Sequence, residues 1–179
     1  MLRKLKMNLN TTHREINEGR ILMNTNSIAN PIISPDLIFI HPEATSNIEL
    51  IKLMAKQLMN QKLVKDEFID AILQRESEYP TGVPIGDIAA AIPHTDAIYV
   101  NNSAMVVSVL KNPIPFANMA NPDEYLPVQI VFMLAMKEPA FQIAWLKKLL
   151  SFLNNPENLQ TLQVINTRQK MADYLNRSL

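Results

Sequence analysis

The chain has 179 residues, which is enough for one domain with a single buried core and too few for two ordinary domains. Lys and Arg number 17, as do Asp and Glu, and this zero formal net charge argues against bulk electrostatic binding to nucleic acid or to anionic membrane. The absence of cysteine excludes a disulfide scaffold, a thiolate zinc site and a cysteine nucleophile, and with only 3 histidines and 3 glycines we expect neither a metal nor a cofactor.

Residues 1–34 are predicted to form an N-terminal extension ahead of the folded domain. Within residues 1–30, five Lys and Arg residues stand against two Glu residues, which gives this stretch a charge of +3 and leaves −3 for the other 149 residues. The stretch holds six asparagines and no aromatic residue, so it buries little apolar surface, and we expect a disordered or loosely docked arm. No apolar run reaches the length that a secretory signal or a transmembrane helix needs, so we expect a cytoplasmic protein.

The first predicted elements are a strand and two helices. Residues 37–40 form a short apolar run rich in β-formers and predict the strand. Ser46, with Glu49 three residues later, forms a capping box, which predicts the start of a helix. The predicted core face of this helix consists of apolar residues at helical spacing, namely Ile48, Ile51, Ala55 and Leu58. Asp66 is predicted to cap the second helix, which ends near Glu76.

The rest of the chain predicts a loop, three strands and three helices. Residues 79–86 hold two of the three glycines and two prolines, which predicts a loop. Residues 87–92 predict a short strand, and the apolar runs at 104–110 and 128–135 predict strands that are covered on both faces. Helices are predicted over residues 141–153, 155–165 and 167–175, with Asn155 and Thr167 as the N-caps of the last two. We therefore expect an α/β fold in one domain of residues 35–179, with a mixed central β-sheet flanked by helices on both sides.

His94 is the candidate nucleophile. It follows an apolar strand and Pro93, an arrangement that holds an imidazole ring at the rim of a sheet. The two residues after it, Thr95 and Asp96, can form a turn, and either can hydrogen-bond the ring. On the chemistry of the residue alone, a histidine with a purely structural role remains an open alternative.

Several segments form one spaced pattern around His94, namely Arg75-Glu76, Pro80-Thr81-Gly82, Gly86 and residues 91–96, followed by residues 111–116, residues 131–135 and the helix over 141–153. This pattern resembles the active-site signature of the enzyme IIA domains of the bacterial sugar phosphotransferase system, in the fructose/mannitol superfamily. The resemblance covers the chain from about residue 35 to its end, and the spacing is more specific than any single segment. Thr95-Asp96 and residues 133–136 are most similar to the galactitol-type branch.

The resemblance implies a phosphoryl carrier. His94 would accept a phosphoryl group on Nε2 from the small phosphocarrier protein and pass it to a cysteine of a IIB component, in galactitol- or fructose-type uptake. Association with the membrane would then be indirect, through the IIC component, and nucleic acid would not be a partner. A neutral imidazole is nucleophilic only at the nitrogen without a proton, so we expect a carbonyl or carboxylate acceptor at Nδ1.

The resemblance also assigns roles to residues at some distance from His94. Arg75 matches the arginine that precedes the loop in this family and would stabilise the charge of the phosphoryl group, although it can equally complement a helix C-terminus. In the preferred register Gln142 stands where many members carry a second histidine, and a shift of two residues would place Ala140 there. The Gln142 amide can donate a hydrogen bond to a phosphoryl oxygen but supplies no positive charge, and an ordinary polar residue of a first helical turn is the alternative.

Partner docking is predicted at an exposed apolar rim near His94 that includes Val83, Pro84 and Ile85. Two alternatives to the transport function remain open. One is a regulatory protein related to IIA domains, whose phosphorylation state controls the binding of partners in carbon or nitrogen signalling. The other is a domain with a purely structural binding role, which a buried and inaccessible His94 would favour. The oligomeric state and the identity of the sugar are left open.

Overall fold

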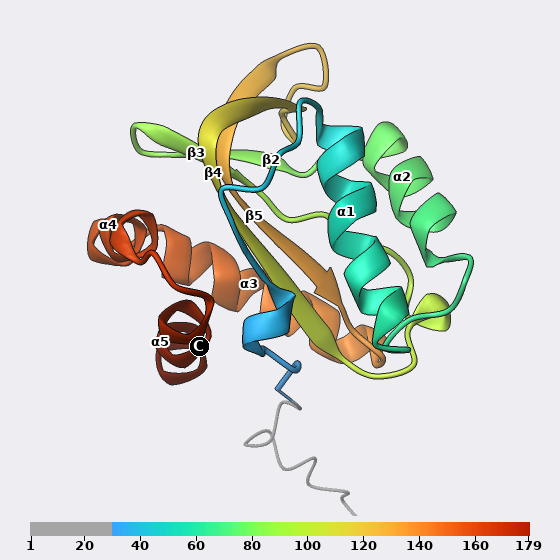
Figure 1. The fold of residues 1–179 in the computed structure, drawn as a ribbon. Helices are drawn as coiled ribbons and strands as arrows, with labels where there is room; N and C mark the ends of the chain where they lie inside the picture. The colour runs from blue at the N-terminus through green and yellow to red at the C-terminus, as the bar shows by residue number, and fades with distance from the viewer. Residues whose placement is uncertain (1–29) are drawn as a thin grey trace, which may run out of the picture.

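The computed structural model of the chain describes residues 30–179 (Figure 1), so most of the predicted N-terminal extension, residues 1–34, lies outside the described residues. The first described residues lie against the sheet. The Ile32 N–H donates to the Ser103 carbonyl at 2.8 Å, and the Met105 N–H donates to the Ile32 carbonyl at 3.0 Å. Backbone pairing therefore ties residue 32 to the start of a central strand.

Five strands form one mixed sheet in the order β1-β4-β5-β3-β2. The strands are β1 (Ile38–Ile40), β2 (Gly82–Ile85), β3 (Ile88–Ala91), β4 (Ala104–Ala117) and β5 (Tyr125–Ala135). The pairs β1–β4 and β3–β5 are parallel, whereas β4–β5 and β2–β3 are antiparallel. The predicted mixed central sheet is confirmed.

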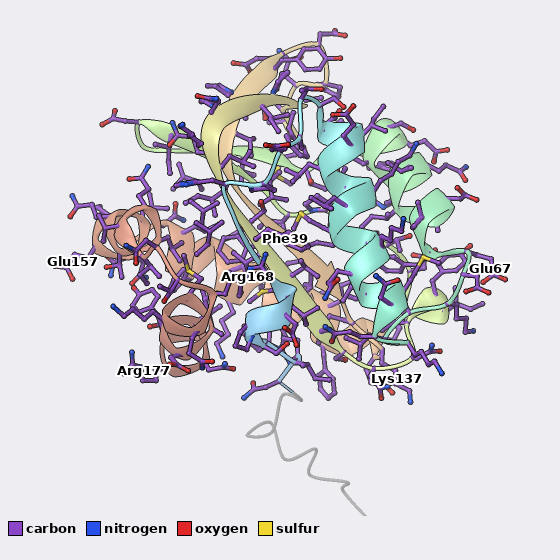
Figure 2. All side chains as sticks on the ribbon, viewed as in Figure 1. Phe39, Glu67, Lys137, Glu157, Arg168 and Arg177 are labelled. Atoms are coloured by element: carbon purple, nitrogen blue, oxygen red, sulfur yellow. The ribbon has the colours of Figure 1, made fainter. Side chains whose placement is uncertain are left out.

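Helices cover both faces of this sheet. In Figure 1, α1 (Asn47–Asn60) and α2 (Phe68–Glu78) lie on one side, and α3 (Pro139–Leu153), α4 (Pro156–Val164) and α5 (Arg168–Ser178) lie on the other. Charged side chains such as Glu67, Glu157 and Arg177 project outward (Figure 2). No helix within residues 30–179 is long and apolar enough to span a bilayer.

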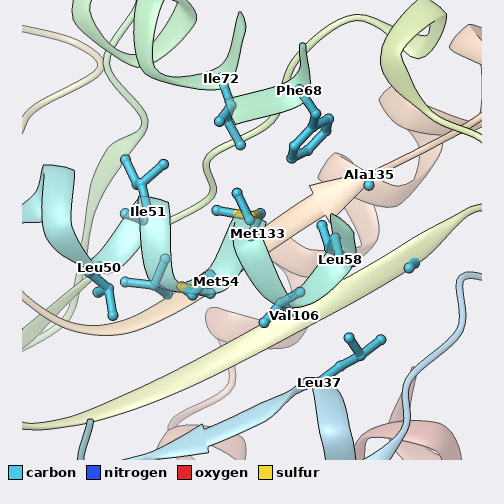
Figure 3. Close-up of a cluster of buried hydrophobic side chains, with 14 of the residues drawn as sticks. Leu37, Leu50, Ile51, Met54, Leu58, Phe68, Ile72, Val106, Met133 and Ala135 are labelled. Carbon is cyan, nitrogen blue, oxygen red and sulfur yellow. The ribbon is translucent and has the colours of Figure 1, made fainter. Parts of the chain in front are cut away.

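Each face of the sheet has its own buried cluster. Under α1 and α2, Met54 and Phe68 pack with Val106 and Met133 of the sheet (Figure 3). On the opposite face, Trp145 of α3 packs with Phe132 of β5 and with residues of α5. Alternate residues of β4 and β5 enter opposite clusters, which explains why both strands read as continuous apolar runs.

Three of the predicted helix caps are confirmed. The side chains of Ser46, Asn155 and Thr167 each accept a backbone N–H in the first turn of the following helix. The predicted cap of α2 is wrong, because Glu67 occupies the N-cap position without a side-chain hydrogen bond and the helix runs on to Glu78. Ile48 is also not a core residue, since its side chain in the first turn of α1 is 52% exposed.

The predicted loop over residues 79–86 is wrong for its second half. Residues Gly82–Ile85 form β2, which pairs with β3 through a two-residue turn at Gly86 and Asp87, where Gly86 has φ +56°. Pro84 is tolerated because β2 is an edge strand. Composition suggested a loop here, but a glycine at positive φ followed by one polar residue is a hairpin signal.

Strands β4 and β5 form a hairpin and are longer than the predicted runs at 104–110 and 128–135, because pairing resumes beyond a register shift between Val109 and Ile114 and continues to Ala117 and Tyr125. The tip of the hairpin folds back over β2, where the Met119 N–H donates to the Gly82 carbonyl at 2.8 Å. A Cβ atom on Gly82 would lie 2.5 Å from the Ala117 carbonyl oxygen, so glycine is what permits this close approach.

Candidate active site around His94

His94 lies at the carboxyl end of β3, beside the end of its parallel neighbour β5. The Leu134 N–H donates to the Pro93 carbonyl at 2.9 Å, and His94 forms a parallel bridge with Leu134. The imidazole is half-buried and lines a pocket of about 390 Å³. His94 is therefore both anchored to the sheet and open to a pocket.

The orientation of the ring determines its chemistry. Nδ1 of His94 lies 2.7 Å from the carbonyl oxygen of Ile92. A carbonyl only accepts hydrogen bonds, so Nδ1 carries the proton of the neutral ring and Nε2 carries the lone pair. The expected acceptor at Nδ1 is thus a backbone carbonyl. Burial lowers the pKa of His94 below 6.5, as does the charge of Arg75, while the bond to Ile92 opposes the shift.

Arg75, in the last turn of α2, lines the same pocket as His94. Its Nη1 donates to the Tyr79 carbonyl at 3.1 Å, and its guanidinium lies 4.4 Å from the centroid of the Tyr79 ring. A cation–π contact and a hydrogen bond together fix the guanidinium of this pocket-lining residue against Tyr79. The structure therefore brings together the predicted nucleophile and the predicted cation.

The rest of the pocket is largely apolar and is assembled from several parts of the fold. Met119 and Pro122 come from the tip of the β4–β5 hairpin, and Leu146 and Leu150 come from α3. The loop between α2 and β2 and the strands themselves supply further walls. Apolar walls of this kind displace water, which strengthens every electrostatic interaction inside the pocket.

Thr95 and Asp96 take different positions after the histidine. Thr95 is buried, and Asp96 is exposed at the N-cap of a short 3₁₀ helix (Ala97–Tyr99), where the Tyr99 N–H donates to its carbonyl at 3.2 Å. Neither residue lines the pocket, and the Nδ1 proton points to Ile92.

Gln142 lies in the first turn of α3 and is half-buried. It stands one turn before Leu146 on the helix face that reaches the pocket, but it lies outside the residues that line the pocket. The docking rim predicted at Val83, Pro84 and Ile85 is wrong for Val83 and Ile85, because both side chains point inward from β2 and are only 7% and 5% exposed, whereas Pro84 is exposed. Tyr79 and Met119, which are 60% and 56% exposed, are large apolar side chains that line the pocket.

Glu76 belongs to a segment that carries the resemblance, but the sequence assigned it no role, and the structure shows that it is buried behind the loop that follows α2. Its Oε1 accepts from the Thr81 N–H at 3.1 Å, and its Oε2 accepts from the Thr81 hydroxyl at 2.8 Å. Burial raises the pKa of Glu76 to about 7, against the opposing effect of these hydrogen bonds. Periodicity offered a signal, since Phe68, Ile72 and Glu76 are spaced four apart and form the buried stripe of α2.

Comparison with known proteins gives a consistent result. The chain matches the family described as "Phosphoenolpyruvate-dependent sugar phosphotransferase system, EIIA 2" over residues 31–178. It is 30% identical to the galactitol-specific EIIA component of the phosphotransferase system of Escherichia coli K12 over 129 residues. The matched region covers 72% of this chain and 85% of that protein. It is 31% identical over 104 residues to the transcriptional regulator ManR of Bacillus subtilis, covering 58% of this chain but 14% of ManR.

Solved structures share the fold. The crystal structure of IIA mannitol from Escherichia coli has a TM-score of 0.65 at 19% identity and covers 83% of this chain and 99% of that chain. The complex of enzyme IIA MTL with phosphorylated enzyme IIB MTL from the same species has a TM-score of 0.57 at 20% identity, over 70% and 84% of the two chains. The mixed sheet with helices on both faces is therefore common to these proteins.

Proposed function

Because the chain belongs to the EIIA 2 family of the phosphoenolpyruvate-dependent sugar phosphotransferase system, we propose that it carries the phosphoryl group on Nε2 of His94. Proteins of this family are phosphotransferases that work with a phosphocarrier protein and a IIB component. The observation that carries the assignment is the 2.7 Å contact between Nδ1 and the Ile92 carbonyl, which leaves the Nε2 lone pair as the nucleophile of a ring that lines the pocket.

The proposed transfer takes place in two balanced steps. The Nε2 lone pair attacks phosphorus on a phosphohistidine of the phosphocarrier protein; the new N–P bond forms as the donor N–P bond breaks, and the electron pair of that bond returns to the donor ring. A cysteine thiolate of the IIB component then attacks the same phosphorus, an S–P bond forms, and the Nε2–P electron pair returns to His94. Nδ1 keeps its proton throughout, so the bond to Ile92 persists in every state.

The neighbouring residues take supporting roles in this proposal. Arg75 stabilises the negative charge of the transferring phosphoryl oxygens, since its guanidinium is fixed at the pocket by Tyr79. Gln142 is a candidate N–H donor from the first turn of α3. Thr95 and Asp96 hold the turn that follows the nucleophile, one buried and the other at the cap of a 3₁₀ helix.

The uptake system that this chain serves is proposed to be of the galactitol or fructose type. Its support is the galactitol-specific relative, which the chain matches over 85% of that protein's length. The rate of phosphoryl transfer from the phosphorylated protein to purified IIB components distinguishes the galactitol type from the fructose type. We expect the galactitol-type IIB to accept the phosphoryl group fastest. The regulatory alternative draws on the ManR match, and it predicts transfer to no IIB component together with a change in affinity for another partner.

The direct test of the nucleophile is labelling from phosphoenolpyruvate with the general components of the system. We expect wild type to gain one acid-labile phosphate and His94→Ala to gain none. His41→Ala is the matched control, because His41 is exposed and lies outside the pocket, and it should label like wild type. Unlabelled wild type, or a fully labelled His94→Ala protein, contradicts the assignment.

A further inference from the structure

The last turn of α2 holds the loop over residues 79–81 from two sides. Arg75 contacts the loop from the pocket side, through the carbonyl and the ring of Tyr79. Glu76, the next residue, contacts it from the interior and takes both hydrogen-bond donors of Thr81. Glu76 is only 7% exposed, and a carboxyl group is costly to bury, so its paired contact with one residue calls for an explanation.

Thr81 connects Glu76 to the nucleophile through the backbone. The Thr81 carbonyl accepts the Ile92 N–H at 3.2 Å, and the Ile92 carbonyl accepts the His94 Nδ1–H at 2.7 Å. On its other side, the segment is held to β5 by the bond from the Leu134 N–H to the Pro93 carbonyl. The segment that orients the imidazole is thus anchored on one side by β5 and on the other by Thr81.

We propose that Glu76 and Thr81 form a positioning pair, which fixes the Ile92 carbonyl and thereby keeps the His94 ring in the tautomer and orientation that present Nε2 to the pocket. This inference rests on the proposed role of His94 as the phosphoryl carrier. Neither residue touches the reacting atoms in this scheme, so both act through the backbone of residue 92. The same loop carries the Tyr79 contacts of Arg75, so the pair also keeps the cation in register with the nucleophile.

The pair works in either protonation state of Glu76. The carboxylate accepts both donors of Thr81, whereas the neutral acid accepts the N–H with its carbonyl oxygen and donates its own proton to the hydroxyl. Glutamine reproduces the second pattern, since its amide oxygen accepts and its amide nitrogen donates. The hydrogen bonds, and not the charge, therefore do the positioning.

Substitution of Thr81 tests this inference. Thr81→Val keeps the shape of the side chain and removes the hydroxyl that Glu76 accepts from, while Thr81→Ser keeps the hydroxyl. Tyr174→Phe is the matched control, because it removes a hydroxyl that donates to Asn158 at 2.7 Å on the other face of the sheet. The readouts are the phosphorylation rate at saturating phosphocarrier protein, and the ring ¹⁵N chemical shifts of His94, which report where its proton resides.

We expect Thr81→Val to be phosphorylated about tenfold or more slowly and to show an increased population of the Nε2–H tautomer, since small misplacement of a reacting group is costly. Thr81→Ser should return both readouts close to wild type, and Tyr174→Phe should change neither. Unchanged tautomer and rate in Thr81→Val, or an equal loss of rate in Tyr174→Phe, overturns the inference.

A second variant covers the case in which Thr81→Val does not fold. Glu76→Gln keeps both contacts with Thr81, so we expect the wild-type tautomer and a rate within about threefold of wild type. A shift to the Nε2–H tautomer in this variant overturns positioning by hydrogen bonds. If wild type accepts no phosphate, the proposed function fails, and the tautomer shifts still decide whether Thr81 positions the ring.

Discussion

The buried carboxyl of Glu76 makes the stability of this protein depend on pH in a predictable way. Burial raises the pKa of Glu76 in the folded state from 4.5 to about 7, so the folded protein holds this proton more tightly than the unfolded chain does. The stability that Glu76 contributes is therefore complete below pH 4.5 and declines until the folded group has ionised above pH 7. At 1.36 kcal/mol for each pKa unit, the loss amounts to about 3 kcal/mol.

Glu76→Gln removes this titration and keeps the hydrogen bonds to Thr81. We expect the free energy of unfolding of the variant, relative to wild type, to increase by about 2–3 kcal/mol between pH 5 and pH 8. The comparison of two pH values cancels any constant effect of the substitution itself. Urea unfolding followed by the fluorescence of Trp145, the single tryptophan and a buried one, measures both proteins in the same way.

Glu67→Gln is the matched control for this experiment. Glu67 precedes the same helix, is exposed and projects away from the protein (Figure 2), so its replacement removes the same charge without the burial. Its difference from wild type should stay nearly constant between the two pH values. A constant difference for Glu76→Gln as well would refute the argument, because it would mean that burial does not perturb Glu76.

Three further predictions follow from the geometry around His94. Gly82→Ala should lower the free energy of unfolding by about 1–3 kcal/mol and slow phosphorylation, because its Cβ would displace the hairpin tip that supplies Met119 to the pocket. Gly86→Ala is the control: its positive φ strains the alanine, but open space surrounds it, so the phosphorylation rate should not change. Equal phosphorylation rates for the two variants would contradict the argument. Arg75→Gln should slow phosphorylation about a hundredfold in single-turnover labelling, and Arg75→Lys should recover part of the rate. A wild-type rate in Arg75→Gln would exclude a role for Arg75 in stabilising the phosphoryl charge. The phosphorylation rate should fall on acidification with a midpoint below pH 6.5, because burial lowers the pKa of the His94 imidazole and only the neutral ring attacks. A stopped-flow pH profile measures this midpoint, and a value above pH 6.5 would contradict the prediction.

Local patterns in the sequence were sufficient for much of the fold. The caps at Ser46, Asn155 and Thr167 depend on side chains that bond within one helical turn, so a short window of sequence contains all the necessary partners. The two central strands are equally legible, because a strand covered on both faces is apolar at every position.

The parts that local patterns did not reveal depend on contacts between distant segments. The hairpin tip is rich in prolines and polar residues, and it is ordered by the bond from Met119 to Gly82, which lies far away in the sequence. The inward orientation of Val83 and Ile85 follows from pairing with β3, so it could not be read from their own segment. Likewise, the Nδ1 acceptor proved to be a backbone carbonyl, whose direction no side-chain pattern encodes.

A carrier has to accept a phosphoryl group and also release it, and the groups around His94 act in opposite directions on the phosphorylated state. In the proposed scheme the ring becomes cationic when Nε2 is phosphorylated, which strengthens the hydrogen bond from Nδ1 to the Ile92 carbonyl. Burial and the charge of Arg75 disfavour a cationic ring, as they do for protonation, whereas the same guanidinium attracts the phosphoryl oxygens. In this scheme burial and Arg75 together keep the free ring neutral and nucleophilic. The guanidinium offsets its repulsion of the cationic ring by its attraction for the phosphoryl oxygens, so neither state is bound too tightly for the group to be transferred.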